Sequence, residues 1–221
     1  MEKVFCVIPA WNEEKNIGQV LPRVQPWVDE IVVVNDGSRD NTRLEAGKHG
    51  VTVLNHLINQ GQGAALETGN QYCLEKGADI IVHFDADGQF KPEEIKDVLK
   101  PLKEKEVDIV FGSRFLEKKS DIPWQKKNVI FPLARIVNKH LLKVDLTDPQ
   151  SGFRAFSKET APLIKVEQNG MAHCSEIMYK TFKNKLRFKE VPIMVIYNDY
   201  GQSFGGGIRI IKDLLLAKIT D

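Results

Sequence analysis

Mostly apolar runs alternate with helical patterns along the first half of this chain, and this alternation sets the fold class. The runs cover residues 4–8, 31–34, 51–54, 80–84 and 107–112. Runs of this kind are typical of strands that are buried on both faces of a sheet. Strands that alternate with helices form right-handed crossovers in a mostly parallel sheet, with helices on both sides. The sequence therefore predicts an α/β fold, a three-layer sandwich around a mostly parallel central sheet.

Four of these runs end at polar clusters. The clusters cover residues 9–13, 35–38, 85–89 and 112–114. In an open α/β sheet the carboxyl ends of parallel strands meet at one rim, and ligands bind beyond that rim. Four polar clusters at one rim therefore predict a site for a ligand and a metal.

The cluster after the fourth run contains two carboxylates and an amide. Asp85 and Asp87 are two residues apart, and Gln89 follows two residues later. Alternate residues of an extended chain face the same side, so the two carboxylates can converge, and they would repel each other without a cation between them. Mg²⁺ and Mn²⁺ prefer oxygen ligands and often share the phosphates of a substrate. The alternative is a solvated turn, because Asp and Gly favour turns.

The second half of the chain is less regular. We expect a turn and a short strand around residues 148–154, a helix over 175–183 and an edge strand within 187–197. Pro192 indicates an edge because it lacks the N–H that a central strand needs. In the first half, Asn12 is expected to cap a helix that starts directly after it.

Charge is balanced over the whole chain, with a formal net charge of +1, so nothing indicates nucleic acid as a partner. Locally the charge is uneven, because residues 114–143 contain eight Lys or Arg side chains against two acids. Such a segment can face phosphate or an anionic membrane, or it can form the solvated face of a helix.

Three cysteines, Cys6, Cys73 and Cys174, fit no zinc or redox spacing, and we interpret them as reduced thiols of a cytoplasmic protein. His173 beside Cys174 is expected to pack in the interior, since adjacent residues rarely bind one metal together. The opening residues do not resemble a signal peptide, and no apolar stretch reaches the roughly 20 residues of a membrane span. We expect a single domain over residues 1–221.

Six short motifs occur in order along the chain. They are Ile8–Glu14 (IPAWNEE), Asn35–Ser38 (NDGS), Asn59–Ala65 (NQGQGAA), Asp85–Gln89 (DADGQ), Gly112–Arg114 (GSR) and Ser151–Arg154 (SGFR). Each motif is weak alone, but the ordered set resembles the family 2 glycosyltransferases with the GT-A (Rossmann-like) fold over nearly the whole chain. Within that family the motifs are most similar to the dolichyl- and polyprenyl-phosphate mannose and glucose synthases.

The resemblance implies an enzyme, an inverting and metal-dependent hexosyltransferase. Its donor would be a nucleotide sugar such as GDP-mannose or UDP-glucose, its acceptor a dolichyl or polyprenyl phosphate, and its cofactor Mg²⁺ or Mn²⁺. Residues 1–112 would form the nucleotide-sugar-binding half, 113–207 the acceptor half and 208–221 an amphipathic C-terminal helix. A lipid acceptor also implies a peripheral contact at the cytoplasmic face of the membrane.

The resemblance also assigns roles to single residues. The catalytic residues would be Asp87, Arg114 and Glu176, and the metal ligands Asp85, Asp87 and Gln89. The residues expected to bind the nucleotide sugar are Pro9, Trp11, Glu13, Val34, Asp36, Gly61, Gly63, Asp85, Ala86, Asp87 and Arg114. The residues expected to bind the acceptor are Arg114, Ser151 and Arg154. Among these, Val34 and Asp36 would contact the base, the two glycines would let the backbone approach the nucleotide, and Glu176 would orient the sugar or act as a base.

The chain departs from the family pattern near its end. The polyprenyl-phosphate synthases usually carry basic residues around a late glycine-rich loop, where this chain has Asn198 and Phe204. This difference weakens the assignment of the acceptor more than that of the donor. The basic segment 114–143 and a helix expected over 208–219 would compensate at a membrane surface.

Other functions stay open at this point. A family 2 glycosyltransferase with a saccharide, glycolipid or protein acceptor would keep the same donor site. A non-catalytic nucleotide-sugar-binding protein would bind the donor without transfer. Nucleotidyl transfer also uses acidic metal sites, but Pro9, Ala10 and Trp11 stand where its glycine-rich phosphate loop would be needed. The sugar, the base, the choice of metal and the oligomeric state are not determined by the sequence.

Overall fold

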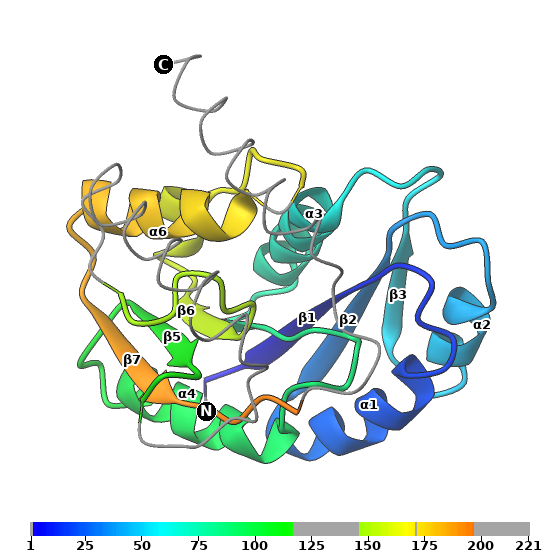
Figure 1. Ribbon diagram of the computed structural model, residues 1–221, viewed down its shortest axis with the longest axis horizontal. Coiled ribbons are helices and arrows are strands. Elements are labelled where there is room, and N and C mark those ends of the chain that lie inside the picture. The colour runs from blue at the N-terminus through cyan, green and yellow to red at the C-terminus, as the bar shows by residue number, and fades with distance from the viewer. Residues whose placement is uncertain (1, 117–145, 171, 197–221) are drawn as a thin grey trace.

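The computed structural model describes residues 2–116, 146–170 and 172–196 of the chain. Figure 1 shows a central sheet with helices on both of its faces, as the sequence predicts. The strands are β1 (Val4–Ala10), β2 (Glu30–Asn35), β3 (Thr52–Asn55), β4 (Ile80–His83), β5 (Ile109–Ser113), β6 (Arg154–Ser157) and β7 (Phe188–Pro192). Their order across the sheet is β3-β2-β1-β4-β6-β5-β7.

The sheet is parallel except at β6, which runs antiparallel to both β4 and β5. The short strand expected after residues 148–154 is confirmed, but its place between β4 and β5 was not predicted. β7 lies at the edge of the sheet and ends at Pro192, as expected for a residue without an N–H. Because β6 pairs with β4, the turn that precedes β6 is brought close to the residues that follow β4.

Helices cover both faces of the sheet. They are α1 (Ile17–Val24), α2 (Thr42–Gly47), α3 (Gln62–Glu75), α4 (Ile95–Lys103) and α6 (His173–Lys183), with short 3₁₀ turns η1 (Gln25–Trp27), η2 (Pro92–Glu94) and η4 (Ala161–Ile164). Buried residues of α1, α2 and α4 share one apolar core, and those of α3, η4 and α6 share the other. Along β1, Cys6 and Ile8 belong to the first core and Phe5 and Val7 to the second. This alternation explains why the strand is apolar at every position.

The helix predicted directly after Asn12 begins only at Ile17, so the prediction that Asn12 caps it is wrong. Asn12 has a φ of +58°, and its Oδ1 accepts a hydrogen bond from the N–H of Arg39 at 2.9 Å. The N–H of Asn12 donates to Ser38 Oγ at 3.0 Å. Asn12 therefore joins the loops that follow β1 and β2, and its side chain is not available to the helix.

Several predictions concern residues that the structure does not describe. The basic segment lies outside the described residues from position 117 to 143, and so does the helix expected over 208–221. In the described part of the chain, no helix is long and apolar enough to cross a membrane. The three cysteines are free thiols with buried side chains, as expected.

Candidate active site

The loop after β4 carries the two acidic residues at the carboxyl rim of the sheet. We call Asp85 and Asp87 the acidic tip. Phe84 lies in a buried cluster of aromatic rings beneath the loop, and Ala86 between the two acids is buried as well. The N–H of Gln89 donates to Asp87 Oδ1 at 2.9 Å and closes the turn. The backbone of the acidic tip is therefore fixed by packing below it and by a hydrogen bond within it.

The carboxylate of Asp85 is held from two sides. Gln62, the first residue of α3, donates from Nε2 to Asp85 Oδ1 at 2.9 Å. On the other side lies Gly152, in the turn before β6, where an added Cβ would be 2.6 Å from Asp85 Oδ2. Any side chain at position 152 would therefore displace the carboxylate. The sequence motifs contained both residues, but Gln62 was given no role and Gly152 was quoted only as part of a turn.

The electrostatics of the acidic tip disfavour two ionised carboxylates. Burial, followed by the charge of Asp87, raises the pKa of Asp85 to about 7. Burial also raises the pKa of Asp87 above its ordinary value. Two carboxylates that resist ionisation next to each other would be stabilised by a cation between them. The expected role of these residues therefore has a physical basis in the structure.

The donor set of the acidic tip fits a hard divalent cation that a ligand helps to bind. Among the described residues, no group of three or more His, Cys, Asp and Glu side chains converges on one point. Two carboxylates and the amide of Gln89 supply fewer oxygens than Mg²⁺ or Mn²⁺ needs. Glu13 lies near enough that, after burial, the charge of Asp87 helps to raise its pKa. The remaining coordination positions would be filled by water or by phosphate oxygens of a substrate.

The loop after β1 offers one large exposed ring near this rim. Trp11 is 54% exposed, whereas Pro9 is buried within β1. Glu13 is fixed by two contacts: its Oε2 accepts from Asn16 Nδ2 at 2.7 Å, and its N–H donates to Thr42 Oγ1 at 2.7 Å. Of the three residues expected here, Trp11 is the one whose side chain can present a flat face to a base.

Val34 and Asp36 were expected to contact the base, but the structure buries both side chains. Val34 packs in the core shared by α3 and α6. Asp36 accepts the N–H groups of Gln60 and Gly61 at 2.9 and 2.7 Å, and its Oδ1 lies 2.7 Å from Nδ1 of His56. Asp36 therefore shapes the loop between β3 and α3, and its oxygens are occupied by the protein itself.

Gly61 and Gly63 were expected to let the backbone approach a nucleotide, but they allow a different contact. A Cβ at Gly61 would overlap the carbonyl oxygen of Asn169, and a Cβ at Gly63 would overlap that of Gln168. The N–H of Gly63 donates to the carbonyl of Asn169 at 2.8 Å. The glycines therefore admit the chain segment before α6, because only backbone without side chains can come so close.

Arg114 follows the end of β5 and makes a bidentate ion pair with Asp148. Nε of Arg114 lies 2.6 Å from Oδ2, and Nη2 lies 2.7 Å from Oδ1. The side chain of Asp148 is fully buried, and that of Arg114 is 12% exposed. Glu190 of β7 accepts the N–H groups of Thr147 and Asp148 and holds this segment in place. The guanidinium is thus oriented by a buried acid that sequence reasoning did not include in the site.

Ser151 and Arg154 were expected to bind the acceptor, and the structure turns Arg154 inward. Arg154 is 1% exposed, and its Nη2 donates to the carbonyl of Ser151 at 2.9 Å and to Cys174 Sγ at 3.2 Å. Its Nε donates to the carbonyl of Gly152 at 3.3 Å. Arg154 therefore supports the turn that contacts Asp85. The hydroxyl of Ser151 is buried without a hydrogen-bond partner among the described residues.

Glu176 was expected to be catalytic, but its carboxylate is engaged with the chain before α6. It accepts the N–H groups of Glu167 and Gln168 at 2.9 to 3.1 Å and pairs with Lys180 at 2.8 Å. The same segment continues into the carbonyls that contact Gly61 and Gly63. The structure therefore gives Glu176 the role of anchoring a loop.

His173 and Cys174 form a buried polar pair behind the turn that carries Gly152. Nε2 of His173 lies 3.3 Å from Sγ of Cys174. Burial opposes ionisation of Cys174, but the charges of His173 and Arg154 outweigh it and lower the pKa of the thiol to about 6. Both side chains pack in the interior, as expected.

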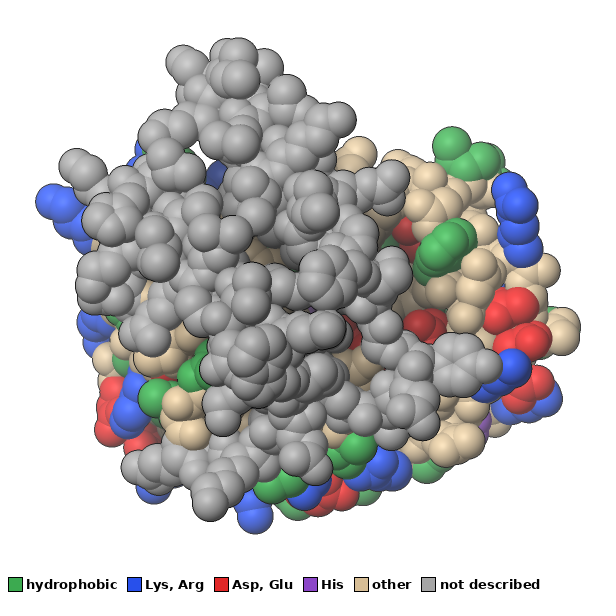
Figure 2. All heavy atoms as spheres, in the orientation of Figure 1, with side chains coloured by type: hydrophobic (Ala, Val, Ile, Leu, Met, Phe, Trp, Pro, Cys, Tyr) green, Lys and Arg blue, Asp and Glu red, His purple; other side chains and the backbone are tan. Residues whose placement is uncertain are grey.

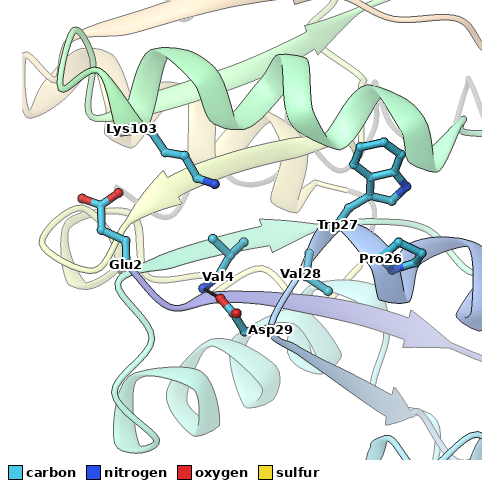
Figure 3. Close-up of a pocket in the computed structure, with 7 residues that line it drawn as sticks. All are labelled: Glu2, Val4, Pro26, Trp27, Val28, Asp29 and Lys103. Atoms are coloured by element: carbon cyan, nitrogen blue, oxygen red, sulfur yellow. Dashed lines mark hydrogen bonds between the residues drawn. The ribbon is translucent and has the colours of Figure 1, made fainter.

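Two hollows among the described residues lie far from the acidic tip. One of about 340 Å³ is lined by Val4, Trp27, Asp29 and Lys103 among others, at the amino ends of β1 and β2 (Figure 3). Ligands of open α/β sheets bind at the opposite, carboxyl rim. The site is therefore built on the acidic tip and the loops beside it, and not on these hollows.

Comparison with known proteins agrees with this placement. The family model described as "Glycosyl transferase family 2" matches residues 5–161. The chain belongs to glycosyl transferase family 2. The matched residues include β1 to β6 and the whole acidic tip, and the chain is accordingly a glycosyltransferase.

Two curated relatives of this glycosyltransferase align with nearly its whole length. UDP-N-acetylglucosamine–dolichyl-phosphate N-acetylglucosaminyltransferase of Methanococcus voltae is 35% identical over 242 residues, which cover 98% of this chain and 96% of the relative. Undecaprenyl-phosphate mannosyltransferase of Micrococcus luteus is 29% identical over 218 residues, which cover 93% and 89%. The resemblance to the lipid-phosphate branch of the family is thereby confirmed.

An enzyme of known crystal structure has the same fold. Glucosyl-3-phosphoglycerate synthase from Mycobacterium tuberculosis, solved in complex with Mg²⁺ and uridine diphosphate, superposes with a TM-score of 0.77 at 20% identity. The match covers 97% of this chain and 78% of that protein. The prediction of a GT-A fold for this glycosyltransferase is therefore confirmed.

Proposed function

We propose that this enzyme transfers a sugar from a nucleoside diphosphate sugar to a polyprenyl or dolichyl phosphate, with the help of Mg²⁺ or Mn²⁺. The observation that carries the proposal is the acidic tip, where Asp85 and Asp87 share a site that disfavours their ionisation without a cation. The names of the relatives from Methanococcus voltae and Micrococcus luteus support the acceptor class. They also extend the expected donors, GDP-mannose and UDP-glucose, to UDP-N-acetylglucosamine.

The residues present fit a divalent cation held by Asp85, Asp87 and Gln89. When bound, the cation would neutralise negative charge on the departing nucleoside diphosphate. Gln62 orients the Asp85 carboxylate toward this task, and Trp11 offers its exposed ring to the base. In this proposal the diphosphate lies at the end of β4 and the base lies toward β1.

Arg114 is the residue that we assign to the acceptor phosphate. The buried carboxylate of Asp148 binds the Nε and Nη2 edge of the guanidinium and orients the group, and an acceptor phosphate would bind at the other edge, formed by Nη1 and Nη2. An acceptor phosphate oxygen would form a bond to the anomeric carbon while the bond from that carbon to the diphosphate breaks, which inverts the configuration and releases the nucleoside diphosphate. A phosphate monoester is largely ionised near neutral pH, so this step needs no strong base. That agrees with the engagement of Glu176 in anchoring a loop.

A second candidate keeps the donor and changes the acceptor. Asn198 and Phe204 stand where polyprenyl-phosphate synthases usually have basic residues, and these positions lie outside the described part of the chain. A saccharide, glycolipid or protein acceptor would not need those charges.

A transfer assay tests the proposal and separates the two candidates. Purified enzyme is incubated with labelled UDP-N-acetylglucosamine, GDP-mannose or UDP-glucose, with a polyprenyl phosphate in detergent or a saccharide acceptor, and with Mn²⁺, Mg²⁺ or EDTA. We expect transfer to polyprenyl phosphate that is lost in EDTA and in Asp87→Asn, but kept in Glu75→Gln, an exposed carboxylate at the end of α3. Full activity of Asp87→Asn would refute the proposed role of the acidic tip.

A further inference from the structure

The loop between β3 and α3 exposes two large aliphatic side chains side by side. Leu57 is 100% exposed and Ile58 is 71% exposed. Figure 2 shows hydrophobic side chains that stand out at the upper right, where Figure 1 places this loop. Residues 55–62 contain no Asp, Glu, Lys or Arg, although 28% of the whole chain is charged. An exposed aliphatic pair in an uncharged loop is unusual for a solvated surface. It indicates a place where a membrane or another molecule makes contact.

The exposure of this pair is maintained by the interior of the protein. Asp36 binds the N–H groups of Gln60 and Gly61 and the ring of His56, whose Nε2 lies 2.9 Å from Thr68 Oγ1. These four polar contacts therefore fix the base of the loop. With its base tied in this way, the loop presents both side chains to solvent instead of folding them onto the core.

A close backbone contact fixes the tip of the loop as well. Gly37, with a φ of +65°, lies against the backbone of Ile58 and Asn59, and an added Cβ would overlap it. A loop held at its base and its tip keeps the two aliphatic side chains in water, and their transfer out of water would be favourable.

The loop stands on the same rim as the acidic tip. Gln62 is only four residues beyond Ile58, and its side chain binds Asp85. The loop after β2, which contacts Ile58 through Gly37, also carries Arg39, whose side chain is exposed. An apolar pair flanked by a basic residue at the mouth of the site matches the chemistry of a lipid surface, with hydrocarbon beneath anionic headgroups.

We propose that Leu57 and Ile58 insert into the headgroup region of a lipid bilayer, with Arg39 on the anionic headgroups, so that the rim with the acidic tip faces the membrane. The inference rests on the proposed function, because a lipid-linked phosphate has to reach that rim. Two aliphatic side chains are too small a patch for a stable protein interface, which buries roughly 800 Å² on each partner. A bilayer requires no matching shape, so two side chains, together with a basic residue on anionic headgroups, can help to orient an enzyme on it.

Vesicle binding tests this inference independently of sugar transfer. Sedimentation with vesicles of phosphatidylcholine and phosphatidylglycerol compares the wild type with Leu57→Asn/Ile58→Asn and with the control Leu163→Asn, an exposed leucine of η4. Each aliphatic side chain is expected to contribute about tenfold to partitioning, so the double variant should bind about 100-fold more weakly. The control should bind like the wild type, and Arg39→Gln should weaken binding only when phosphatidylglycerol is present.

Two further measurements keep the outcome unambiguous. In Leu57→Trp, emission should shift to the blue on addition of vesicles by more than that of the three native tryptophans in the wild type. The double variant should unfold at the wild-type temperature and bind Mn²⁺ and nucleotide sugar normally. Equal vesicle binding by wild type and double variant, or a loss of nucleotide-sugar binding in the variant, would overturn the inference. If vesicle binding depends on Leu57 and Ile58 while no transfer to polyprenyl phosphate is detected, the inference stands and the proposed acceptor fails.

Discussion

Nε2 of Gln62 lies 2.9 Å from Oδ1 of Asp85 and joins the first turn of α3 to the end of β4. This hydrogen bond fixes Oδ1 of Asp85. Because the carboxylate is planar and rigid, it limits the positions of Oδ2 as well. We expect Gln62→Ala to weaken the binding of Mn²⁺ with nucleoside diphosphate by about tenfold, because one charge-assisted hydrogen bond is lost. Calorimetric titration measures this, and Gln71→Ala, on the exposed side of the same helix, should behave like the wild type.

The pKa of Asp85 predicts how the stability of the cation-free protein depends on pH. The folded protein holds the proton up to a pKa of about 7, whereas an unfolded chain loses it near a pKa of about 3.9. Below the lower value both states are protonated and folding carries no penalty from this group. The penalty grows between the two values and is complete above the higher one, so the free energy of unfolding should fall by on the order of 4 kcal/mol, about 1.4 kcal/mol for each unit of pKa.

Urea unfolding in EDTA at several pH values across this window measures the effect. Asp85→Asn should remove most of the fall, because an amide does not ionise. A divalent cation with nucleoside diphosphate should stabilise the wild type most at the alkaline end. An Asp85→Asn variant with the same pH dependence as the wild type would show that another group causes it.

Gly152 has no room for a side chain because Asp85 occupies that space. In Gly152→Ala the new Cβ would lie 2.6 Å from Oδ2 and would push the carboxylate aside. We expect sugar transfer to fall by about 100-fold with little loss of stability, since a displaced carboxylate disturbs positioning more than packing. Gly47→Ala is the matched control, because a Cβ there meets no atom within 4 Å. Similar activity in the two variants would contradict the proposed position of the Asp85 carboxylate.

Asp148 is predicted to be a structural residue that acts through Arg114. Breaking a buried bidentate pair leaves a partly buried charge without its partner, so Asp148→Asn should lower the free energy of unfolding by about 3 kcal/mol. A double-mutant cycle with Arg114→Ala should recover a coupling energy above about 1 kcal/mol. Strictly additive effects would mean that the two side chains do not stabilise each other.

A substitution of Glu176 distinguishes an anchoring role of this residue from a catalytic one. Glu176→Gln keeps one acceptor oxygen and replaces the other, so it should cost about 1 kcal/mol of stability and change kcat less than threefold, an estimate that treats one hydrogen bond as lost. Removal of a general base would instead lower kcat by about 100-fold or more. Stopped assays of initial rate, together with thermal unfolding of the same variant, distinguish the two roles.

The sequence was sufficient to predict the layers of the fold and the acidic tip, because both follow from local patterns. Continuous apolar strands such as Val4–Ala10 indicate burial on both faces, and Asp85 and Asp87 stand directly after such a strand. The parallel rim then brings separate polar clusters together. These inferences need only the period of a strand and the direction of a crossover.

The residues that support the site could not be predicted in this way, because their contacts join distant parts of the chain. The insertion of β6 between β4 and β5 places Gly152 beside Asp85, and no local pattern encodes that order. The resemblance to the family assigned Asp36 to the base, yet its oxygens accept hydrogen bonds from the loop between β3 and α3. Polar residues at a rim can bind either ligand or backbone, and only the tertiary structure distinguishes the two.

The role of the acidic tip in cation binding is tested by a titration of Mn²⁺ followed by the electron paramagnetic resonance signal of the free ion, with and without uridine or guanosine diphosphate. We expect Mn²⁺ to bind tightly only when a nucleoside diphosphate is present, and Asp87→Asn to weaken this binding by at least about tenfold. Wild-type affinity in Asp87→Asn, or nucleoside diphosphate binding that is equally tight in EDTA, would contradict it.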